Sequence, residues 1–277
     1  MKPMTSTDPI LVIGGTGKTG RRVAARLAAR GVPVRIGSRT GTPPFDWEDP
    51  ATWAPALQGT RAAYISFFPD LAFPGAPAAI AELARTALAA GTRRLVLLSG
   101  RGEEEAERAE QELIASGADW TIVRCSWFSQ NFSEDHFHDH VMAGELALPV
   151  GDVPEPFVDA DDIADVAVAA LTDDRHVGEL YELTGPRLLT FADAAAEIGK
   201  AAGRDVRVAS VTHDEFASGL ARHGVPADVI SLLRYLFTVV LDGRNASLAD
   251  GVQRALGRPP RDFRDYARAA AAAGAWA

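Results

Sequence analysis

The sequence has one cysteine, Cys125, among 277 residues. A single cysteine cannot form a disulfide within the chain, and it cannot supply the paired thiolates of a zinc cluster. We therefore expect a fold that depends on its own packed core and works in a reducing compartment, the cytoplasm.

Long apolar runs and basic blocks are also missing. No stretch approaches the roughly 20 apolar residues of a membrane helix, and Met1 to Pro9 lacks the apolar run of a secretory signal. The 28 Lys and Arg residues are outnumbered by 37 Asp and Glu residues, which gives a formal net charge of −9. We therefore expect no membrane insertion and no nucleic-acid binding through bulk charge. These features do not indicate an oligomeric state.

Short apolar runs alternate with segments of helical periodicity through the first half of the chain. This alternation is typical of a parallel sheet covered by helices. The predicted strands are Ile10 to Ile13, Val34 to Gly37, Phe45 to Trp47, Ala62 to Phe67, Arg94 to Ser99 and Trp120 to Cys125.

A glycine-rich turn follows the first predicted strand and leads directly into a helix. Its glycines satisfy two dinucleotide patterns, GxGxxG from Gly15 and GxxGxxG from Gly14, and both end at Gly17 and Gly20. Glycine is required where a backbone turns tightly and approaches a pyrophosphate, which the N–H groups of the helix start then hold. A nucleotide-triphosphate loop is the alternative, but Val12 stands where that motif needs a glycine.

The second predicted strand indicates which nucleotide binds. A free ribose usually meets an acidic residue about 20 positions after the glycines, yet no acid occurs between Pro9 and Phe45. Ser38 and Arg39 end the strand instead, and a guanidinium suits a ribose phosphate. The sequence therefore favours NADPH over NADH, with a solvated Arg39 as the alternative.

These features predict an α/β protein with a doubly wound parallel-sheet Rossmann fold and a smaller, mostly helical C-terminal lobe. Residues 1–150 are the predicted NAD(P)-binding domain and 151–277 the smaller substrate-side lobe, with 156–184 returning to the main sheet. Capping signals at Thr190 and Thr212 mark two helix starts in that lobe.

Several segments carry a family resemblance. They are ILVIGGTGKTGRRV, RRLVLLSG, SGADWTIVRCSWFSQNF, PFVDADDIADVAVAAL, YELTGP, TFADAAAEIGKAAGR and LGRPPRDFRDYA. Together they resemble the NmrA-like group of atypical short-chain dehydrogenases, which includes NADPH-dependent quinone oxidoreductases and redox-sensing regulators without activity.

The resemblance implies positions for the cofactor and the substrate. It places the loops Ser66 to Pro69, Ser99 to Arg101 and Ser126 to Phe128 toward the nicotinamide, and Asp46 near the adenine. The predicted cofactor residues are Gly14, Thr16, Gly17, Lys18, Thr19, Gly20, Ser38, Arg39, Asp46, Ser66, Phe67 and Ser99. The predicted substrate-pocket residues are Phe68, Trp127, Phe128 and His136, with ordinary core packing as the alternative for the aromatic side chains.

The usual catalytic pair of the classical relatives is missing. They use a tyrosine with a lysine four residues later, but the lysines here are Lys2, Lys18 and Lys200, and Ala196 stands four residues before the last. Many quinone reductases of the group carry a lysine where Gln111 stands. The sequence thus identifies no catalytic acid.

Histidines and acids cluster after the aromatic loop, from Glu134 to His140. His136 and His140 would share a helix face, a spacing that can bind a metal, but no third ligand is apparent. We therefore predict no metal, and a solvated helix on which His136 is able to donate a proton.

Three functions follow from these observations. The first is an NADPH-dependent oxidoreductase that passes hydride to a quinone or similar flat conjugated acceptor, in aromatic polyketide tailoring. The second is a non-catalytic NADP(H)-sensing regulator, and the third is an NADPH- and oxygen-dependent monooxygenase component acting on an aromatic polyketide.

Overall fold

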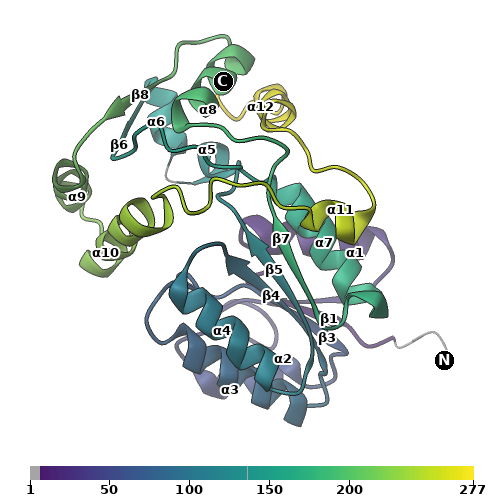
Figure 1. Cartoon of the computed structure of the whole chain (residues 1–277). Helices are drawn as coiled ribbons and strands as arrows, with labels where there is room; N and C mark the ends of the chain where they lie inside the picture. Colours follow the sequence, from purple (N-terminus) through teal and green to yellow (C-terminus); the bar gives the residue numbers. More distant parts are fainter. Residues whose placement is uncertain (1–6, 136) are drawn as a thin grey trace. The chain divides into compact units, whose positions relative to one another are not determined.

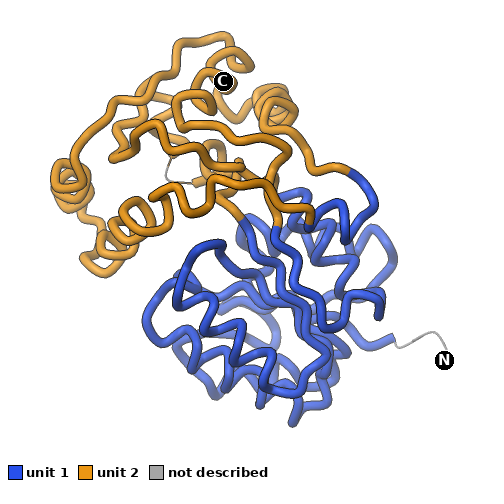
Figure 2. Tube along the Cα trace, viewed as in Figure 1, with its two compact units in different colours: residues 1–125, 160–182, 251–258 blue, residues 126–159, 183–250, 259–277 orange. Residues whose placement is uncertain are grey.

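A computed structural model describes residues 7–135 and 137–277, which form two compact units (Figure 2). Unit 1 holds the chain up to Cys125 together with Ala160–Glu182 and Gly251–Arg258. Unit 2 holds Ser126–Asp159, Leu183–Asp250 and Pro259–Ala277. The chain thus first leaves unit 1 at Cys125, ahead of the expected division at residue 150, and much of segment 156–184 lies in unit 1.

The centre of unit 1 is a six-stranded sheet of order β2-β1-β3-β4-β5-β7. The pairs β1·β2, β1·β3, β3·β4 and β4·β5 are all parallel, which confirms the predicted fold class. The strands are β1 Ile10–Ile13, β2 Val34–Gly37, β3 Ala62–Ile65, β4 Arg94–Gly100, β5 Asp119–Cys125 and β7 Glu179–Leu183. Every residue of β1 and β3 is buried, as expected of strands covered on both faces.

The predicted strand at Phe45 to Trp47 is wrong, because this segment forms only an isolated bridge between Asp46 and Asp49. The Asp46 carboxylate accepts a hydrogen bond from the Glu48 N–H at 3.1 Å, which turns the chain. The Trp47 ring packs edge-on against Phe45 and Trp53, with centroids 5.1 and 5.5 Å apart. Aromatic packing on a turn therefore produced the β-like apolar pattern, and β7 is the sixth strand.

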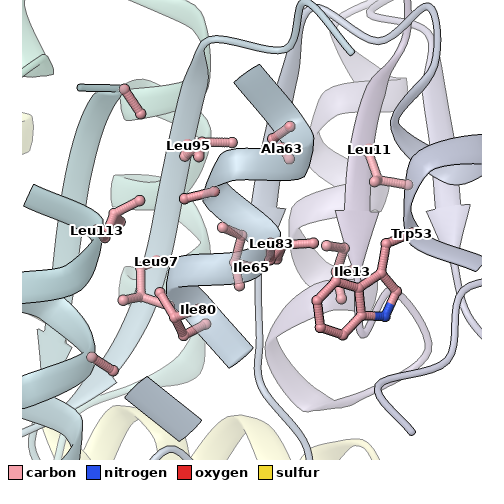
Figure 3. Close-up of a cluster of buried hydrophobic side chains, with 14 of the residues drawn as sticks. Leu11, Ile13, Trp53, Ala63, Ile65, Ile80, Leu83, Leu95, Leu97 and Leu113 are labelled. Atoms are coloured by element: carbon pink, nitrogen blue, oxygen red, sulfur yellow. The ribbon is translucent and has the colours of Figure 1, made fainter. Parts of the chain in front are cut away.

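Helices cover both faces of this sheet (Figure 1). On one face lie α1 Lys18–Ala29, α7 Ala160–Thr172 and α11 Gly251–Leu256, and on the other lie α2 Trp53–Leu57, α3 Ala76–Ala89 and α4 Glu104–Ala115. Figure 3 shows the core under the second set, where Ile80 and Leu83 of α3 meet Ile65 and Leu97 of the sheet. Two 3₁₀ turns, Pro50–Thr52 and Asp174–His176, complete the unit.

Unit 2 contains short helices and a two-stranded parallel sheet. Its elements are α5 Asn131–Glu134, α6 His138–Ala143, β6 Glu145–Leu148, α8 Phe191–Ala202, β8 Arg207–Ser210, α9 His213–Arg222, α10 Ala227–Tyr235, a π-helical turn Leu236–Val240 and α12 Phe263–Ala272. Both predicted capping signals are confirmed, because Thr190 with Asp193 and Thr212 with Glu215 form capping boxes. No helix in the described ranges is both long and apolar enough to cross a membrane.

An ion-pair network joins segments of unit 1 that are far apart in the sequence. Arg26 of α1 donates to Asp161 and Asp165 of α7, each at 2.7 Å. Arg258, just after α11, donates to Asp162 and Asp165, also at 2.7 Å. Asp162 is fully buried, so its charge depends on this pairing for compensation.

We expect Asp162→Asn to lower the free energy of unfolding by about 1–3 kcal/mol, because the substitution removes the buried charge that Arg258 meets. Urea unfolding followed by circular dichroism measures the change. Glu82→Gln is the matched control, since Glu82 pairs with Arg85 on the exposed surface of α3 and such pairs contribute little. Equal midpoints for Asp162→Asn and the wild-type protein would contradict this account of the network.

Candidate functional site

The turn after β1 brings the glycine-rich segment against the end of β3. Gly14 has a positive φ of 71°, and a Cβ there would lie 3.1 Å from the Ser66 Cβ. The Gly14 N–H donates to the Gly37 carbonyl at 3.0 Å, and the Gly17 N–H donates to the Gly14 carbonyl at 2.9 Å. Predicted residues Gly14, Gly17 and Ser66 therefore meet at the carboxyl ends of β1 and β3.

Gly20 and Gly17 differ in what surrounds them. A Cβ on Gly20 would overlap the Gly14 carbonyl and lie 2.9 Å from the Gly15 Cα, so α1 packs on the turn only through glycine. A Cβ on Gly17 would meet nothing within 4 Å except the Gly14 oxygen at 3.3 Å, and its φ of −77° suits any residue. Gly17 thus leaves open space at the N-terminus of α1, where a dinucleotide pyrophosphate fits.

One side chain and one backbone carbonyl next to this space have structural partners. The Thr19 hydroxyl is buried and accepts a hydrogen bond from the Tyr64 hydroxyl at 2.9 Å. The Lys18 carbonyl accepts from Arg22 at 2.8 Å. Thr16 and Gly17 are exposed, so the backbone N–H groups of the turn are the anion donors that this geometry offers.

The end of β2 presents the predicted ribose-phosphate residues. The Ser38 carbonyl accepts hydrogen bonds from the N–H groups of Gly41 and Phe45, at 3.0 and 2.9 Å, which closes a tight loop. Arg39 is exposed on that loop, and it has no ion-pair partner within residues 7–135 and 137–277. Its guanidinium is therefore available to an incoming anion.

Trp47 fixes the loop after β3. Its indole N–H donates to the Ser66 carbonyl at 3.1 Å, and its ring packs on Phe67 with a centroid distance of 4.7 Å. The Asp46 carboxylate next to it is engaged in its own turn. Of the residues predicted here, Ser66 is brought to the glycine turn, whereas Phe67 is held in an aromatic group with Trp47.

Ser99 of β4 belongs to a buried charged network that sequence reasoning missed. Its hydroxyl donates to Glu110 of α4 at 2.6 Å, and Glu110 is fully buried. The Arg124 Nε donates to the same carboxylate at 2.9 Å, and this hydrogen bond raises the pKa of Arg124. The hydroxyl hydrogen of Ser99 is thus committed to Glu110, and a cofactor would meet only its oxygen lone pairs.

Sequence reasoning also missed two carboxyl groups that follow the carboxyl ends of β3 and β4. Asp70, in the loop after β3, accepts from the Ala72 N–H at 2.8 Å and interacts electrostatically with Lys18. Burial raises the pKa of Asp70, and the hydrogen bond and Lys18 only partly oppose it. Burial, followed by the charges of Asp70 and Glu110, raises the pKa of Glu103 well above its usual range.

The predicted substrate-side aromatic residues are divided between the two units. In unit 1, Phe68 is 64% exposed. In unit 2, the half-buried Trp127 stacks on Phe137 at 6.3 Å and packs edge-on against Phe191 at 5.7 Å, contacts typical of an aromatic core. Phe128 forms a bridge with Val158.

One residue of the predicted histidine cluster, His136, lies outside the residues that the structure describes. His138 contacts the Ala275 carbonyl through Nε2 at 2.9 Å. No group of three metal-ligating side chains is found in the described part of the chain.

Comparisons with known proteins agree with this geometry. The model of an NAD(P)H-binding family matches residues 14–174. An uncharacterized oxidoreductase of Bacillus subtilis, YesF, is 34% identical, with 97% of both chains covered. A (4-alkanoyl-5-oxo-2,5-dihydrofuran-3-yl)methyl phosphate reductase of Streptomyces griseus is 34% identical, over 93% of this chain and 96% of its own. An NAD(P)H azoreductase of Xenophilus azovorans is 30% identical, over 95% and 98%.

Solved structures share the fold. The NADPH-dependent quinone oxidoreductase QOR2 of Escherichia coli, complexed with NADPH, matches with a TM-score of 0.74 and 22% identity, over 93% of this chain and 98% of its own. NmrA, a negative transcriptional regulator, matches with a TM-score of 0.69 and 18% identity, over 95% of both chains. The predicted family resemblance and the NAD(P)H cofactor are thereby confirmed. The chain shares its fold with NmrA, and it belongs to the NAD(P)H-binding family as an NAD(P)H-dependent oxidoreductase.

Proposed function

We propose that the protein uses NADPH to reduce a quinone or a similarly flat, conjugated acceptor, within aromatic polyketide tailoring. The observation that carries the cofactor choice is Arg39, exposed and without an ion-pair partner in the described chain, at a strand end where an acid would select NADH. A 2′-phosphate would give this guanidinium a charge-assisted partner.

The residues that would hold the cofactor lie in unit 1. Backbone N–H groups of Thr16, Lys18 and Thr19 would bind the pyrophosphate beside Gly17, Ser38 and Arg39 would bind the ribose phosphate, and Asp46 would lie beside the adenine. Ser66, Phe67 and Ser99 would stand along the nicotinamide half. When bound, the reduced nicotinamide supplies a hydride, and the chain supplies position and environment.

The acceptor follows from the chemistry that the chain lacks. No tyrosine has a lysine four residues after it, and the hydroxyls of Tyr64, Tyr181 and Tyr266 are each engaged, with Thr19, His176 and Ser133 respectively. Reduction of an ordinary ketone concentrates charge on an alkoxide, which the classical relatives stabilise with a tyrosine hydroxyl made acidic by a lysine, and this pair is missing here. A quinone or enone spreads the charge over its conjugated system, which relaxes that requirement.

The relatives support an acceptor of this kind. The Streptomyces griseus reductase is named for a dihydrofuranone with a conjugated acyl group, and the Xenophilus azovorans enzyme for azo compounds. The exposed Phe68 ring, in the same loop as Ser66, offers a surface on which a flat acceptor would stack.

We expect Gly17→Val to keep the fold and to lose NADPH binding, because its side chain would fill the space at the start of α1. Gly20→Val is the matched variant and should lower the melting temperature, since its side chain would overlap the Gly14 carbonyl. Thermal unfolding and fluorescence titration with NADPH separate the two effects. Normal NADPH affinity in folded Gly17→Val would show that the turn is only structural.

We expect Arg39→Ala to weaken NADPH binding ten-fold to a hundred-fold, which corresponds to about 1.5–3 kcal/mol for a charge-assisted hydrogen bond. NADH binding should change little, because NADH has no 2′-phosphate. Arg30→Ala is the control for net charge, because Arg30 is an exposed arginine at the C-terminal end of α1. Equal affinity of the wild-type protein for NADH and NADPH would overturn the assignment of Arg39.

We expect the wild-type protein to oxidise NADPH with quinones and conjugated enones, and not with aliphatic ketones. Phe68→Ala should raise the KM for a quinone roughly three-fold to ten-fold through loss of ring stacking. Val177→Ala, an exposed apolar residue before β7, should leave it unchanged. The assay is NADPH absorbance with oxygen uptake recorded in parallel.

The other outcomes of this assay each have a meaning. Reduction of ketones but not of quinones or enones would contradict the proposed acceptor class. NADPH binding without turnover of any acceptor would favour the NADP(H)-sensing regulator. Oxygen uptake equal to NADPH consumption would favour the monooxygenase component.

A further inference from the structure

The Glu103 carboxyl group lies over the backbone at the end of β4. A Cβ built on Gly100 would lie 2.1 Å from the carboxyl carbon of Glu103 and 2.1 and 2.2 Å from its two oxygens, so the carboxyl group packs directly on the backbone at position 100. Glu103 is the N-cap residue of α4, and its side chain makes no capping hydrogen bond to that helix. Glycine at position 100 is therefore what admits this carboxyl group.

This position lies at the edge of the sheet where ligands bind. Gly100 pairs with Cys125 at the carboxyl ends of β4 and β5. Asp70 follows the carboxyl end of β3, the strand between β1 and β4. In open α/β sheets the ligand crevice lies outside the carboxyl ends of the strands.

The charges around Glu103 disfavour its ionised form. Asp70 from the loop after β3 and Glu110 from α4 both act on it as negative charges, and Cys125 of β5 lies within its electrostatic range. Lys18 acts on Asp70, and Arg124 pairs with Glu110. Within the described chain no hydrogen bond or ion pair engages the Glu103 carboxyl group. Burial, followed by the charges of Asp70 and Glu110, thus holds the pKa of the Glu103 carboxyl group well above its usual range.

We infer that Glu103, seated on Gly100 and facing Asp70, is the proton donor of the reductase. This inference rests on the proposed function. The acceptor would gain two electrons and one proton as hydride from the reduced nicotinamide, and a second proton from the Glu103 carboxyl group through a new O–H or C–H bond. The nicotinamide is thereby oxidised, and the Glu103 carboxylate regains its proton from water. Asp70 is a positioning residue, because its negative charge keeps the Glu103 proton in place.

The protonation state is tested first on the protein without cofactor. A carboxyl group whose pKa is raised by folding stabilises the fold below its unfolded pKa of about 4.3, and this contribution is lost as pH rises through the folded pKa. Glu103→Gln is neutral at every pH, so its melting temperature should rise relative to wild type as pH increases. Infrared difference titration should show a protonated carboxyl band near neutral pH that is missing in Glu103→Gln.

The role in turnover is tested with whichever quinone or enone the wild-type protein reduces. Glu103→Gln should lower kcat ten-fold to a hundred-fold or more at neutral pH and keep NADPH affinity within two-fold. The wild-type kcat should fall as pH rises through the carboxyl pKa, and this dependence should be absent from the variant. Asp70→Asn should shift the wild-type profile to lower pH. Glu112→Gln, an exposed glutamate on the same helix, should match wild type in all measurements.

The outcomes distinguish this inference from the proposed function. A wild-type protein that reduces no acceptor contradicts the proposed function, while the infrared and stability data still report the proton on Glu103. An unchanged kcat and pH profile in Glu103→Gln would overturn the role of Glu103 as proton donor. Joint loss of kcat and NADPH affinity would also overturn it, because Glu103 would then support the binding site instead.

Discussion

The close packing of α1 on the end of β1 is the constraint on which the site of unit 1 depends. Gly20 allows this approach, because any side chain there would overlap the Gly14 carbonyl. The approach aims the first N–H groups of α1 at the crevice between β1 and β3, where the strand order changes direction. It also brings Ser66 beside Gly14, so the loop after β3 is positioned by the same turn. Phosphate binding and the placement of the next loop thus have one physical cause.

Local chemistry made this turn predictable from the sequence. The glycine spacing, the buried strand before it and the helical periodicity after it all lie within 20 residues and point to one structure. The absence of an acid before Phe45 is equally local. The segment Phe45 to Trp47 misled the prediction because its apolar residues pack on Trp53 around a turn, and a short apolar run does not distinguish a strand from such a cluster.

The site residues that the sequence analysis did not identify are brought together by contacts between distant segments of the chain. Nothing near Glu110 in the sequence indicates that Ser99 and Arg124, on two different strands, meet its carboxylate. Likewise, Asp70 and Glu103 approach each other only because β3 and β4 are neighbours in the sheet. The one local signal was Gly100, a glycine at a strand end three residues before an acid. The aromatic pattern was ambiguous for the same reason, since Trp127 contacts Phe137 and Phe191 within unit 2.

The two acids at positions 103 and 110 of one segment show how the environment divides structural from chemical roles. Glu110 is fully buried but has a guanidinium and a hydroxyl as partners, so its charge is compensated and its function is to hold Ser99 and Arg124. Glu103 has no such partner in the described chain and faces the negative charges of Asp70 and Glu110. A carboxylate with a guanidinium partner stays ionised, whereas a carboxyl group among like charges donates its proton only when a stronger base forms next to it.

A fold shared by reductases and by a transcriptional regulator does not itself require such a group. What sets Glu103 apart from Glu110 is its place beside Gly100, because the paired carboxyl ends of β4 and β5 form the edge of the sheet at which a ligand of this fold binds.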